Sequence, residues 1–557
     1  MKILDGLINR FRPIPSQETT SSLPIQETTS SYPIEDLPNE LIWMILERTG
    51  SFYPAEVNRK WETINATLIN QYWKSNIEAF KKDPLISALM QSMNLDDPLL
   101  TSQQKLIRLY QGLNRISPIS EKSIFCDLVR HSQKIQDTSL EKAWPSMLMA
   151  ILDGHYTGNI LGINAKAKEI RLWLNDPSNQ QALNSITDLY LIGLELTVIP
   201  EEIKRFTQLT ELNISGNPIT VLHPNQFQGL INLSEISLDN NNIQELPPSL
   251  LHGLPNLLRF SISGNKIKEI PPNFLQNLGN LQYLNFSHNQ ITNLPASIFQ
   301  GLTLLEELYL NSNLIRELPS TLLHNLPHLH RFIVYDNKIK EIPQNFLHNS
   351  TNLRYLDFSS NQISGLPQGT FLGLVVLEVL GLNDNQIPVL PSNIFQGLAN
   401  LQALSLSNNR IQELPSNVFQ GLVNLHSLHL EKNQIQELPS NIFQGLANLA
   451  SLHLEKNQIH KLDPDLFQNL PDLRYLHLAH NQIQTFPRSF YKLRLWGLSI
   501  GNNPLERKEI LSVCCRLLFL GDIVPSYWQA KLLLAAVIFV GLYLFYRLDA
   551  VLPIRTW

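Results

Sequence analysis

The sequence predicts an α/β fold: a solenoid of stacked repeats with one parallel sheet, preceded by an α-helical region and followed by a transmembrane helix. Two observations predict the solenoid. Asparagines recur every 24 residues from Asn217 to Asn481, and each closes the pattern L-x-x-L-x-L-x-x-N-x-I, in which another apolar residue sometimes replaces a leucine. A fixed period of this length is typical of stacked units rather than of a closed globule. The third observation, an uncharged apolar run near the end of the chain, predicts the transmembrane helix.

The order of the predicted parts follows from composition and periodicity. Residues 1–36 are rich in Ser, Thr and Pro and predict a disordered leader. Residues 37–65 carry a short motif, and 66–185 show helical spacing of apolar residues, with breaks expected at Pro145 and Pro177 and a last helix at 166–174. Residues 186–505 hold about 14 repeats. A C-terminal cap (506–526), a membrane span (527–547) and a short tail (548–557) complete the chain.

Each repeat begins with a short strand whose side chains alternate between two faces. Leu404 and Leu406 are expected to point inward, while Ala403 and Ser405 face outward. The asparagine at the following bend is expected to be buried, with its amide satisfying free backbone groups. One apolar residue, ten positions after each asparagine, is expected to form an interior spine. These residues are Phe227, Leu251, Leu275, Phe299, Leu323, Leu347, Phe371, Phe395, Phe419, Phe443 and Phe467.

The repeat pattern resembles that of the leucine-rich-repeat family in its typical 24-residue form. The resemblance covers about residues 186–505. It implies a right-handed, curved solenoid with the parallel sheet on its concave face. A stack of this kind offers one long repeated surface, which suits holding a partner better than running a reaction.

Tyrosines and arginines at the outward strand positions are the candidate contacts for a protein ligand. They are Tyr283, Tyr309, Arg331, Tyr335, Arg354 and Tyr355. Tyr and Arg are common anchors in protein interfaces, which favours binding. The alternative is that tyrosine simply suits strands.

Three histidines share one strand position, and two glutamates follow on the same face. His429, His453 and His477 are counted among the candidate partner-binding residues, with Glu431 and Glu455 beside them. Stacked His and Glu side chains could bind a divalent metal or respond to pH. The simpler interpretation is duplication, since LHLEKNQI occurs at 428 and again at 452. On that interpretation the sequence predicts no metal and no cofactor.

Charge and cysteine content narrow the function classes. The formal net charge is −5 and the pI is about 6.3, so no nucleic-acid partner is expected. The three cysteines are Cys126, Cys514 and Cys515, and neither end of the repeat array has a cysteine cluster. This favours a reducing, cytosolic compartment for the bulk of the chain. No nucleotide, zinc-protease or hydrolase motif is present, and we expect no enzyme. A transferase that depends on Cys126 is the alternative to a buried structural cysteine.

The run from Leu532 to Tyr546 has 15 residues without a charge and is bracketed by Lys531 and Arg547. As a helix with a rise of about 1.5 Å per residue, the run spans only about 22 Å, whereas the hydrocarbon core of a bilayer is about 30 Å thick. A helix over 527–547 is long enough to cross the bilayer, because the Lys531 side chain can reach the headgroups. We expect a single-pass membrane protein. The alternative is a buried helix that caps the solenoid.

A second motif precedes the repeats. Leu37-Pro38-x-Glu-Leu41 is followed by Val57-x-x-x-Trp61. This resembles the F-box, in which such residues pack within the motif or contact the adaptor subunit of a cullin-type ubiquitin ligase. The resemblance implies that role for Leu37, Pro38, Leu41, Ile45, Val57 and Trp61. The alternative is a plain helical hairpin.

Together these features predict a membrane-tethered receptor or adaptor whose repeats recruit a protein partner, with a non-catalytic substrate receptor of a ubiquitin ligase as the sharper hypothesis. The combination resembles eukaryotic F-box receptors and eukaryote-like effectors of bacteria that live inside host cells. The rival hypothesis is a scaffold or recognition protein with no ubiquitin role.

Overall fold

The computed structural model describes residues 124–513, apart from 155, 157, 159, 507, 510 and 511. The leader, the F-box-like motif, residues 66–123 of the helical region, the predicted span at 527–547 and the tail lie outside the described residues, as does the cap beyond residue 513. The chain divides into two compact units. The first comprises the residues up to 207 with 214–228 and 241–243, and the second comprises 208–213, 229–240 and 244 onward.

The first unit is mainly helical. Its elements are α6 (Ile124–Asp153), α7 (Ala167–Asn175), η2 (Pro177–Asn179), α8 (Gln180–Asn184), β1 (Asp188–Tyr190) and η3 (Glu201–Arg205). Trp144 of α6 is fully buried and meets Trp173 of α7 edge-on, with ring centroids 5.8 Å apart. Its indole nitrogen donates to the Gly162 carbonyl at 3.0 Å, so the buried polar group is satisfied. Aromatic burial therefore joins α6 to α7.

Two expectations for this helical region need correction. Pro145 does not break a helix, because it lies inside α6. A proline inside a helix removes one backbone hydrogen bond, and the burial of Trp144, Met147 and Ile151 outweighs that loss. The helix expected at 166–174 is present as α7, but it is not the last, since η2 and α8 follow. Pro177 does mark a break, at the first position of η2.

The second unit is a stack of three-residue strands. The strands are β2 (Glu211–Asn213), β3 (Glu235–Ser237), β4 (Arg259–Ser261), β5 (Tyr283–Asn285), β6 (Glu307–Tyr309), β7 (Arg331–Ile333), β8 (Tyr355–Asp357), β9 (Val379–Gly381), β10 (Ala403–Ser405), β11 (Ser427–His429), β12 (Ser451–His453), β13 (Tyr475–His477) and β14 (Gly497–Ser499). Each pairs in parallel with the next along the chain. A short helix, η4 (Phe490–Lys492), precedes β14.

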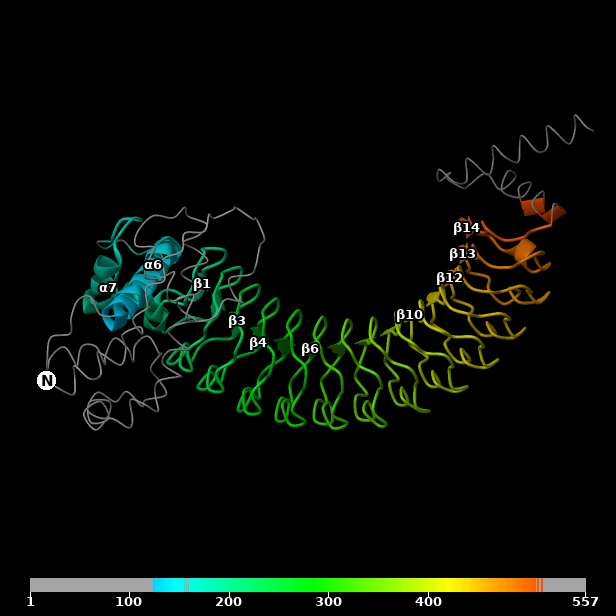
Figure 1. Ribbon diagram of the computed structural model, residues 1–557, viewed down its shortest axis with the longest axis horizontal. Helices are drawn as coiled ribbons and strands as arrows, with labels where there is room; N and C mark the ends of the chain where they lie inside the picture. The colour runs from blue at the N-terminus through cyan, green and yellow to red at the C-terminus, as the bar shows by residue number, and fades with distance from the viewer. Residues whose placement is uncertain are drawn as a thin grey trace, which may run out of the picture. The chain divides into compact units, whose positions relative to one another are not determined.

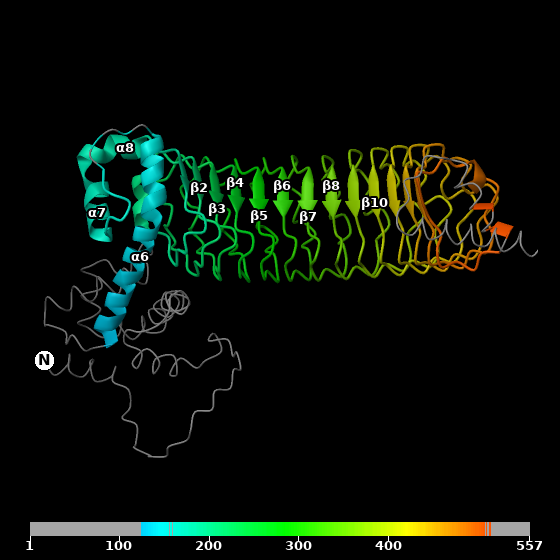
Figure 2. The same cartoon turned by 90° about the horizontal axis from the view of Figure 1, so that it is seen from above.

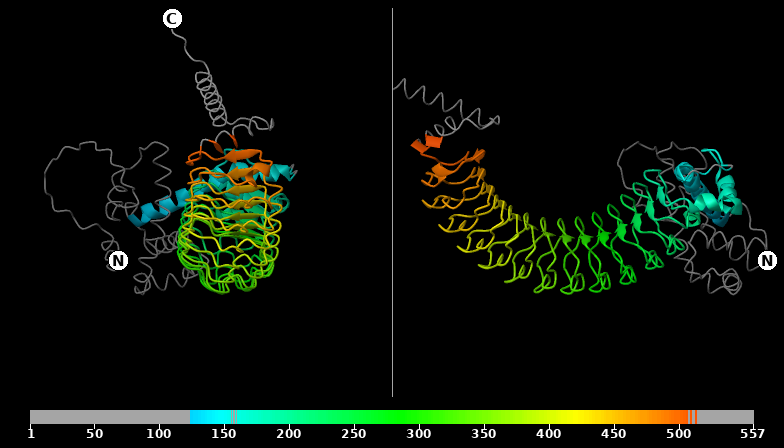
Figure 3. Two further views of the ribbon diagram at one scale, coloured as in Figure 1. Left: turned by 90° about the vertical axis from the view of Figure 1, so that its right-hand side faces the viewer. Right: turned by 180° about the vertical axis from the view of Figure 1, so that it is seen from behind.

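The strands lie on the inner side of a curved stack, as the repeat resemblance implied (Figure 1). The view from above shows them side by side (Figure 2), and the view from behind shows the same curve (right panel of Figure 3). The register is constant: Leu404 of β10 pairs with Leu428 of β11, one repeat later. The predicted alternation is confirmed, because the buried Leu404 and Leu406 alternate with the half-buried Ala403 and Ser405.

The twelve repeated asparagines are all buried, as expected. Asn361 illustrates their role. Its side-chain nitrogen donates to the carbonyls of Val334, in the preceding repeat, and of Phe358 and Ser359, all at 3.1 Å. Its oxygen accepts the Ile339 amide at 3.0 Å. One side chain thus satisfies backbone groups in two neighbouring repeats.

The predicted interior spine is also confirmed. Phe395 is fully buried and stacks between Phe371 and Phe419, with ring centroids 6.1 and 6.2 Å apart. The leucines at the same position in other repeats, such as Leu347, are equally buried. The apolar core therefore runs along the whole stack rather than around a centre.

Among the residues that the structure describes, no helix is both long and apolar enough to cross a bilayer. The predicted span at 527–547 lies outside those residues and stays a prediction.

Candidate binding surface on the concave face

In β2–β8 and β10–β13 the first and third residues of each strand present their side chains outward, while the central residue is buried. Because the strands are in register, residues at one position form a continuous row across neighbouring repeats. The chemistry of the concave face is therefore set by which residue types follow one another at 24-residue steps.

The first strand position repeats the order Glu, Arg, Tyr twice. We call the six residues the Glu-Arg-Tyr row: Glu235, Arg259, Tyr283, Glu307, Arg331 and Tyr355.

Each arginine of this row lies between its glutamate and its tyrosine. The Arg259 Nε is 3.4 Å from a Glu235 carboxylate oxygen, and its guanidinium carbon is 4.1 Å from the centre of the Tyr283 ring. Arg331 repeats the arrangement one triplet later. A carboxylate on one side and an aromatic face on the other hold the guanidinium in place.

The two triplets meet at a pair of tyrosines. Tyr309, at the third position of β6, lies with its ring centroid 5.3 Å from that of Tyr283. The Tyr309 hydroxyl donates to Glu307, and the Asn285 amide donates to the Tyr283 hydroxyl at 3.2 Å. Burial raises the pKa of Tyr309, and the hydrogen bond to the Glu307 carboxylate raises it further. Burial likewise raises the pKa of Tyr283. Both phenols therefore remain neutral at physiological pH.

Arg331 has unused hydrogen-bonding capacity. Its Nε is buried and makes no hydrogen bond, since the nearest Glu307 oxygen is 3.7 Å away. At that distance the two groups form an ion pair, but they are too far apart for a hydrogen bond.

The sequence-predicted concave residues separate into two groups. The structure brings Tyr283, Tyr309, Arg331 and Tyr355 into one connected surface. Arg354 precedes β8 and forms an ion pair with Glu378, in the next repeat, on a neighbouring row. Tyr335 lies two residues beyond the end of β7 and is half-buried.

Sequence reasoning missed Glu235, Arg259 and Glu307, which complete the row. A comparison of segments separated by more than one 24-residue repeat would have revealed them. Residues 259–275 (RFSISGNKIKEIPPNFL) and 331–347 (RFIVYDNKIKEIPQNFL) are close copies. The separation of the two copies is 331 − 259 = 72 residues, or three repeats.

The histidine row, His429, His453 and His477, occupies the third position of β11, β12 and β13. The rings stack almost parallel, with centroids 4.2 and 4.4 Å apart. The Nε2 atoms of His429 and His453 each lie 2.9 Å from a serine hydroxyl, those of Ser427 and Ser451. The histidines are thus packed and oriented rather than free in solvent.

Two glutamates face the other side of these rings. The His429 Nδ1 is 3.5 Å from Glu431 and the His453 Nδ1 is 3.7 Å from Glu455. Burial lowers the pKa of His477, and the charge of His453 lowers it further. Burial raises the pKa of Glu455, but hydrogen bonding and the charges of the histidines outweigh burial, so that the net shift is downward. Sequence spacing predicted the stacked histidines and their glutamates but not the contacts with Ser427 and Ser451.

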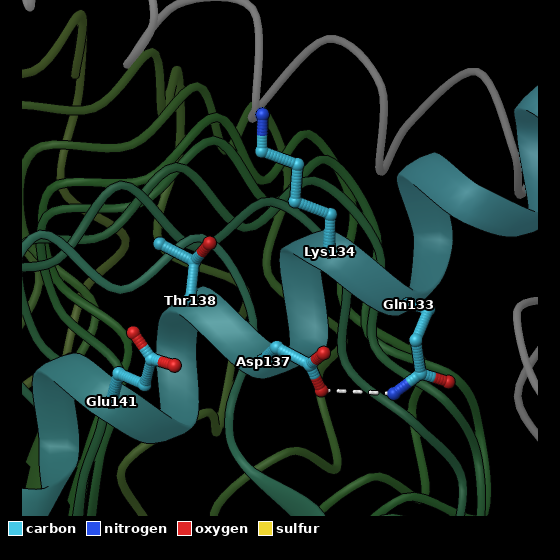
Figure 4. A pocket seen from close by; sticks show the side chains of 5 residues that line it. All are labelled: Gln133, Lys134, Asp137, Thr138 and Glu141. Carbon is cyan, nitrogen blue, oxygen red and sulfur yellow. Dashed lines mark hydrogen bonds between the residues drawn. The ribbon is translucent and has the colours of Figure 1, made fainter. Parts of the chain in front are cut away.

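A separate pocket of about 410 Å³ lies on α6 of the first unit (Figure 4). It is lined by Gln133, Lys134, Asp137, Thr138 and Glu141, all from successive turns of that helix. Asp137 accepts hydrogen bonds from Gln133 at 2.9 Å and from Arg171 at 2.5 Å. Arg171 also binds Glu202 at 2.6 Å. The Asp137 carboxylate is therefore engaged in a structural ion-pair network.

The remaining predicted residues lie elsewhere. Cys126 lies in α6. The six residues of the F-box-like motif fall outside the described residues: Leu37, Pro38, Leu41, Ile45, Val57 and Trp61.

Comparison with known proteins supports the fold. An internalin (inlF) from Listeria monocytogenes str. 4b F2365 superposes with a TM-score of 0.53 at 24% identity, covering 66% of this chain and 96% of that one. The leucine-rich-repeat protein LIC12759 of Leptospira interrogans superposes with a TM-score of 0.54 at 26% identity, covering 64% and 99%. No curated protein matches the chain significantly.

The family model described as "Leucine rich repeat" matches overlapping segments that run without a gap from residue 207 to residue 505, more than half of the chain. The segments are 207–267, 231–291, 255–315, 280–332, 327–387, 377–435, 399–459, 423–483 and 447–505. With the asparagine ladder, the apolar spine and the parallel concave sheet, this match shows that the chain belongs to the leucine-rich-repeat family.

Proposed function

We propose that this chain is a non-catalytic binding protein that holds a protein ligand on its concave face, at the Glu-Arg-Tyr row and the adjoining Tyr309. The observation that carries the proposal is the duplicated triplet, in which each arginine is fixed between a carboxylate and a tyrosine ring.

The fixed conformation of these side chains favours binding. A free arginine or tyrosine loses rotamer freedom when it is immobilised in an interface, at a cost of about 0.5–1.5 kcal/mol. Arg259 and Arg331 are already held by an ion pair and an aromatic face, so that much of this loss is incurred on folding. The surface is pre-organised and mixed in charge, as protein interfaces commonly are.

The row also has a suitable length. Six neighbouring strands at about 4.8 Å spacing span about 24 Å. An extended peptide rises about 3.3 Å per residue, so the row matches a segment of about seven residues. The Arg331 guanidinium, which is held by Glu307 and Tyr355 while its side chain stays one-third exposed, would offer its outer N–H groups to a carbonyl or carboxylate of that segment.

Proximity labelling of the intact chain tests the proposal. The double variant Tyr283→Ala/Arg331→Ala removes one residue from each triplet. The matched control is Lys338→Ala/Lys340→Ala, at two exposed positions beyond β7. We expect partners that the control retains to be lost from the row variant, because interface Tyr and Arg anchors are each worth about 2 kcal/mol or more. An identical partner set for the wild type and the row variant would refute the proposal.

The finer parts of the proposal are an adaptor-binding role for 37–61 and a membrane tether at 527–547. The F-box-like motif and the uncharged apolar run support them. Pro38→Ala with Trp61→Ala should abolish co-purification of a ubiquitin-ligase adaptor while leaving the repeat partners bound. A wild-type chain that captures no adaptor would favour the scaffold alternative. Deleting 527–557 should release the chain from membranes, and unchanged partitioning would overturn the tether.

A further inference from the structure

Three side chains on neighbouring strands bring ligand atoms of metal-binding type together. His429, Glu431 and His453 each place one such atom within 4.8 Å of the other two. From this cluster we infer a binding site for one divalent transition-metal ion, held by two imidazole nitrogens and one carboxylate. The site is independent of the Glu-Arg-Tyr row, which occupies β3–β8.

The hydrogen bonds of the rings leave their other nitrogens free to act as ligands. The Nε2 of His429 is 2.9 Å from the Ser427 hydroxyl, and the Nε2 of His453 is 2.9 Å from that of Ser451. A metal-binding histidine almost always donates its second ring N–H to an outer partner, which fixes its tautomer. In the tautomer that carries the proton on Nε2, both rings donate to the serines and each Nδ1 keeps its lone pair.

No hydrogen bond joins His429 to Glu431. A neutral Nδ1–H donor would approach a carboxylate to about 2.7–3.2 Å, but Nδ1 of His429 lies 3.5 Å from Oε2 of Glu431. That same oxygen is buried without a hydrogen-bond partner. A buried carboxylate oxygen without a partner is costly. A cation shared with the imidazoles would satisfy it.

The overlapping cluster of His453, Glu455 and His477 is the weaker candidate. The strand position that carries Ser427 and Ser451 holds Tyr475 beside His477, so no serine at that position orients its ring. The unpartnered oxygen of Glu455 is Oε2, whereas Oε1 is the atom nearest to His453. Because His453 offers one Nδ1, the two clusters compete for it, and we expect one ion per chain.

The donor set selects the metal. Two imidazoles and a carboxylate suit Zn²⁺, Cu²⁺ or Ni²⁺ better than Mg²⁺ or Ca²⁺, which prefer oxygen ligands. Zinc binds such ligands at about 2.0–2.2 Å, which puts them about 3.5 Å apart in a tetrahedron. The three ligand atoms must therefore move about 1 Å closer together. Rotation about the side-chain bonds allows this movement while the strands stay in register. Water completes the coordination from the solvent side.

Calorimetric titration of the intact, chelator-treated chain with ZnCl₂ at neutral pH tests the inference. We expect one ion per chain. His453→Gln should abolish binding, and His429→Gln and Glu431→Gln should each weaken it at least about tenfold. Ser427→Ala should weaken it about tenfold through the loss of ring orientation. Circular dichroism would verify that each variant keeps its fold.

Two histidines serve as controls. His477→Gln should change the zinc affinity less than about twofold, since His477 belongs to the competing cluster. His426→Gln should have no effect, because the His426 ring is exposed and its Nδ1 contacts the Asn424 carbonyl.

The outcomes separate a built site from adventitious binding. Zinc affinity that survives His429→Gln would place the ion elsewhere and overturn the inference, as would the absence of any zinc binding. If His477→Gln abolished zinc binding while His429→Gln retained it, the ion would belong to the cluster of His453, Glu455 and His477. That result would refute the site at His429, Glu431 and His453. Cobalt substitution gives a second readout, because tetrahedral coordination produces visible absorption bands that His453→Gln should remove.

Discussion

The guanidinium carbon of Arg331 lies 4.1 Å from the centre of the Tyr355 ring. The same distance separates Arg259 from Tyr283, in the copy 72 residues earlier. Two copies with one geometry indicate that the arrangement belongs to the three-repeat unit rather than to one local packing environment. A guanidinium stacks flat on an aromatic ring, which an ammonium cannot do.

Arg331→Lys should therefore cost stability although the charge is kept. We expect a loss of about 0.5–1 kcal/mol, the usual size of a partly exposed cation–π contact. Urea denaturation would measure it. Arg316→Lys, at an exposed position before the next turn, is the matched control and should be neutral. Equal effects of the two substitutions would mean that stacking on Tyr355 contributes nothing.

Tyr309 should ionise only at unusually high pH. Burial and the hydrogen bond to Glu307 raise its pKa, so the folded state favours the neutral phenol. A folded-state pKa above the unfolded value of about 10 means that stability is intact below that pH and is lost as the pH rises beyond it. The ultraviolet tyrosinate signal of the wild type minus that of Tyr309→Phe reports this group. A difference signal that titrates at the ordinary tyrosine pKa would contradict the assigned environment.

Asn361→Ala should destabilise the solenoid by about 2–4 kcal/mol, because it leaves several buried backbone groups without partners. Asn352→Ala is the control: that asparagine is exposed and makes one bond, to the Pro327 carbonyl. We expect the control to lose about 1 kcal/mol or less. Chemical denaturation would measure the free energy of unfolding of both variants. Comparable losses of stability would show that the buried asparagines are not what joins the repeats.

Phe395→Ala should cost about 3–5 kcal/mol, through lost burial and a cavity between Phe371 and Phe419. Phe395→Leu should be milder, because Leu347 fills the same position in another repeat. The ranking of the two variants in urea midpoint is the test. If leucine were as damaging as alanine, the spine would require ring stacking rather than volume.

The solenoid itself was predictable from the sequence because its causes are local and repeated. A buried asparagine such as Asn409 and a spine residue such as Phe395 have the same partners in every turn, so that one repeat explains the others. Pro145 was misjudged because the proline was weighed as a helix breaker, although the apolar residues Trp144, Met147 and Ile151 recur at helical spacing around it.

The concave surface was only partly predictable. Residue type and strand position identified Tyr283, Tyr309, Arg331 and Tyr355, but not their order of contact. Arg259 was missed because a single outward arginine is unremarkable until its neighbours at 24-residue steps are known to be Glu235 and Tyr283. The histidines were recognised from spacing, whereas their orientation depends on Ser427 and Ser451, whose hydroxyls are ordinary in sequence.

His477 should resist protonation in the folded chain. Burial lowers its pKa, and the neighbouring His453 lowers it further. A base whose folded pKa lies below the unfolded value of about 6.5 contributes stability above that pH and loses it as the pH falls below. His477→Gln should therefore reduce the decline of the thermal midpoint between neutral and mildly acidic pH. The comparison is made with a chelator present, so that no metal occupies the row. His426→Gln, which alters an exposed histidine, should leave the decline unchanged. A steeper decline in His477→Gln than in the wild type would mean that the folded state favours the charged ring, against the effect of its burial.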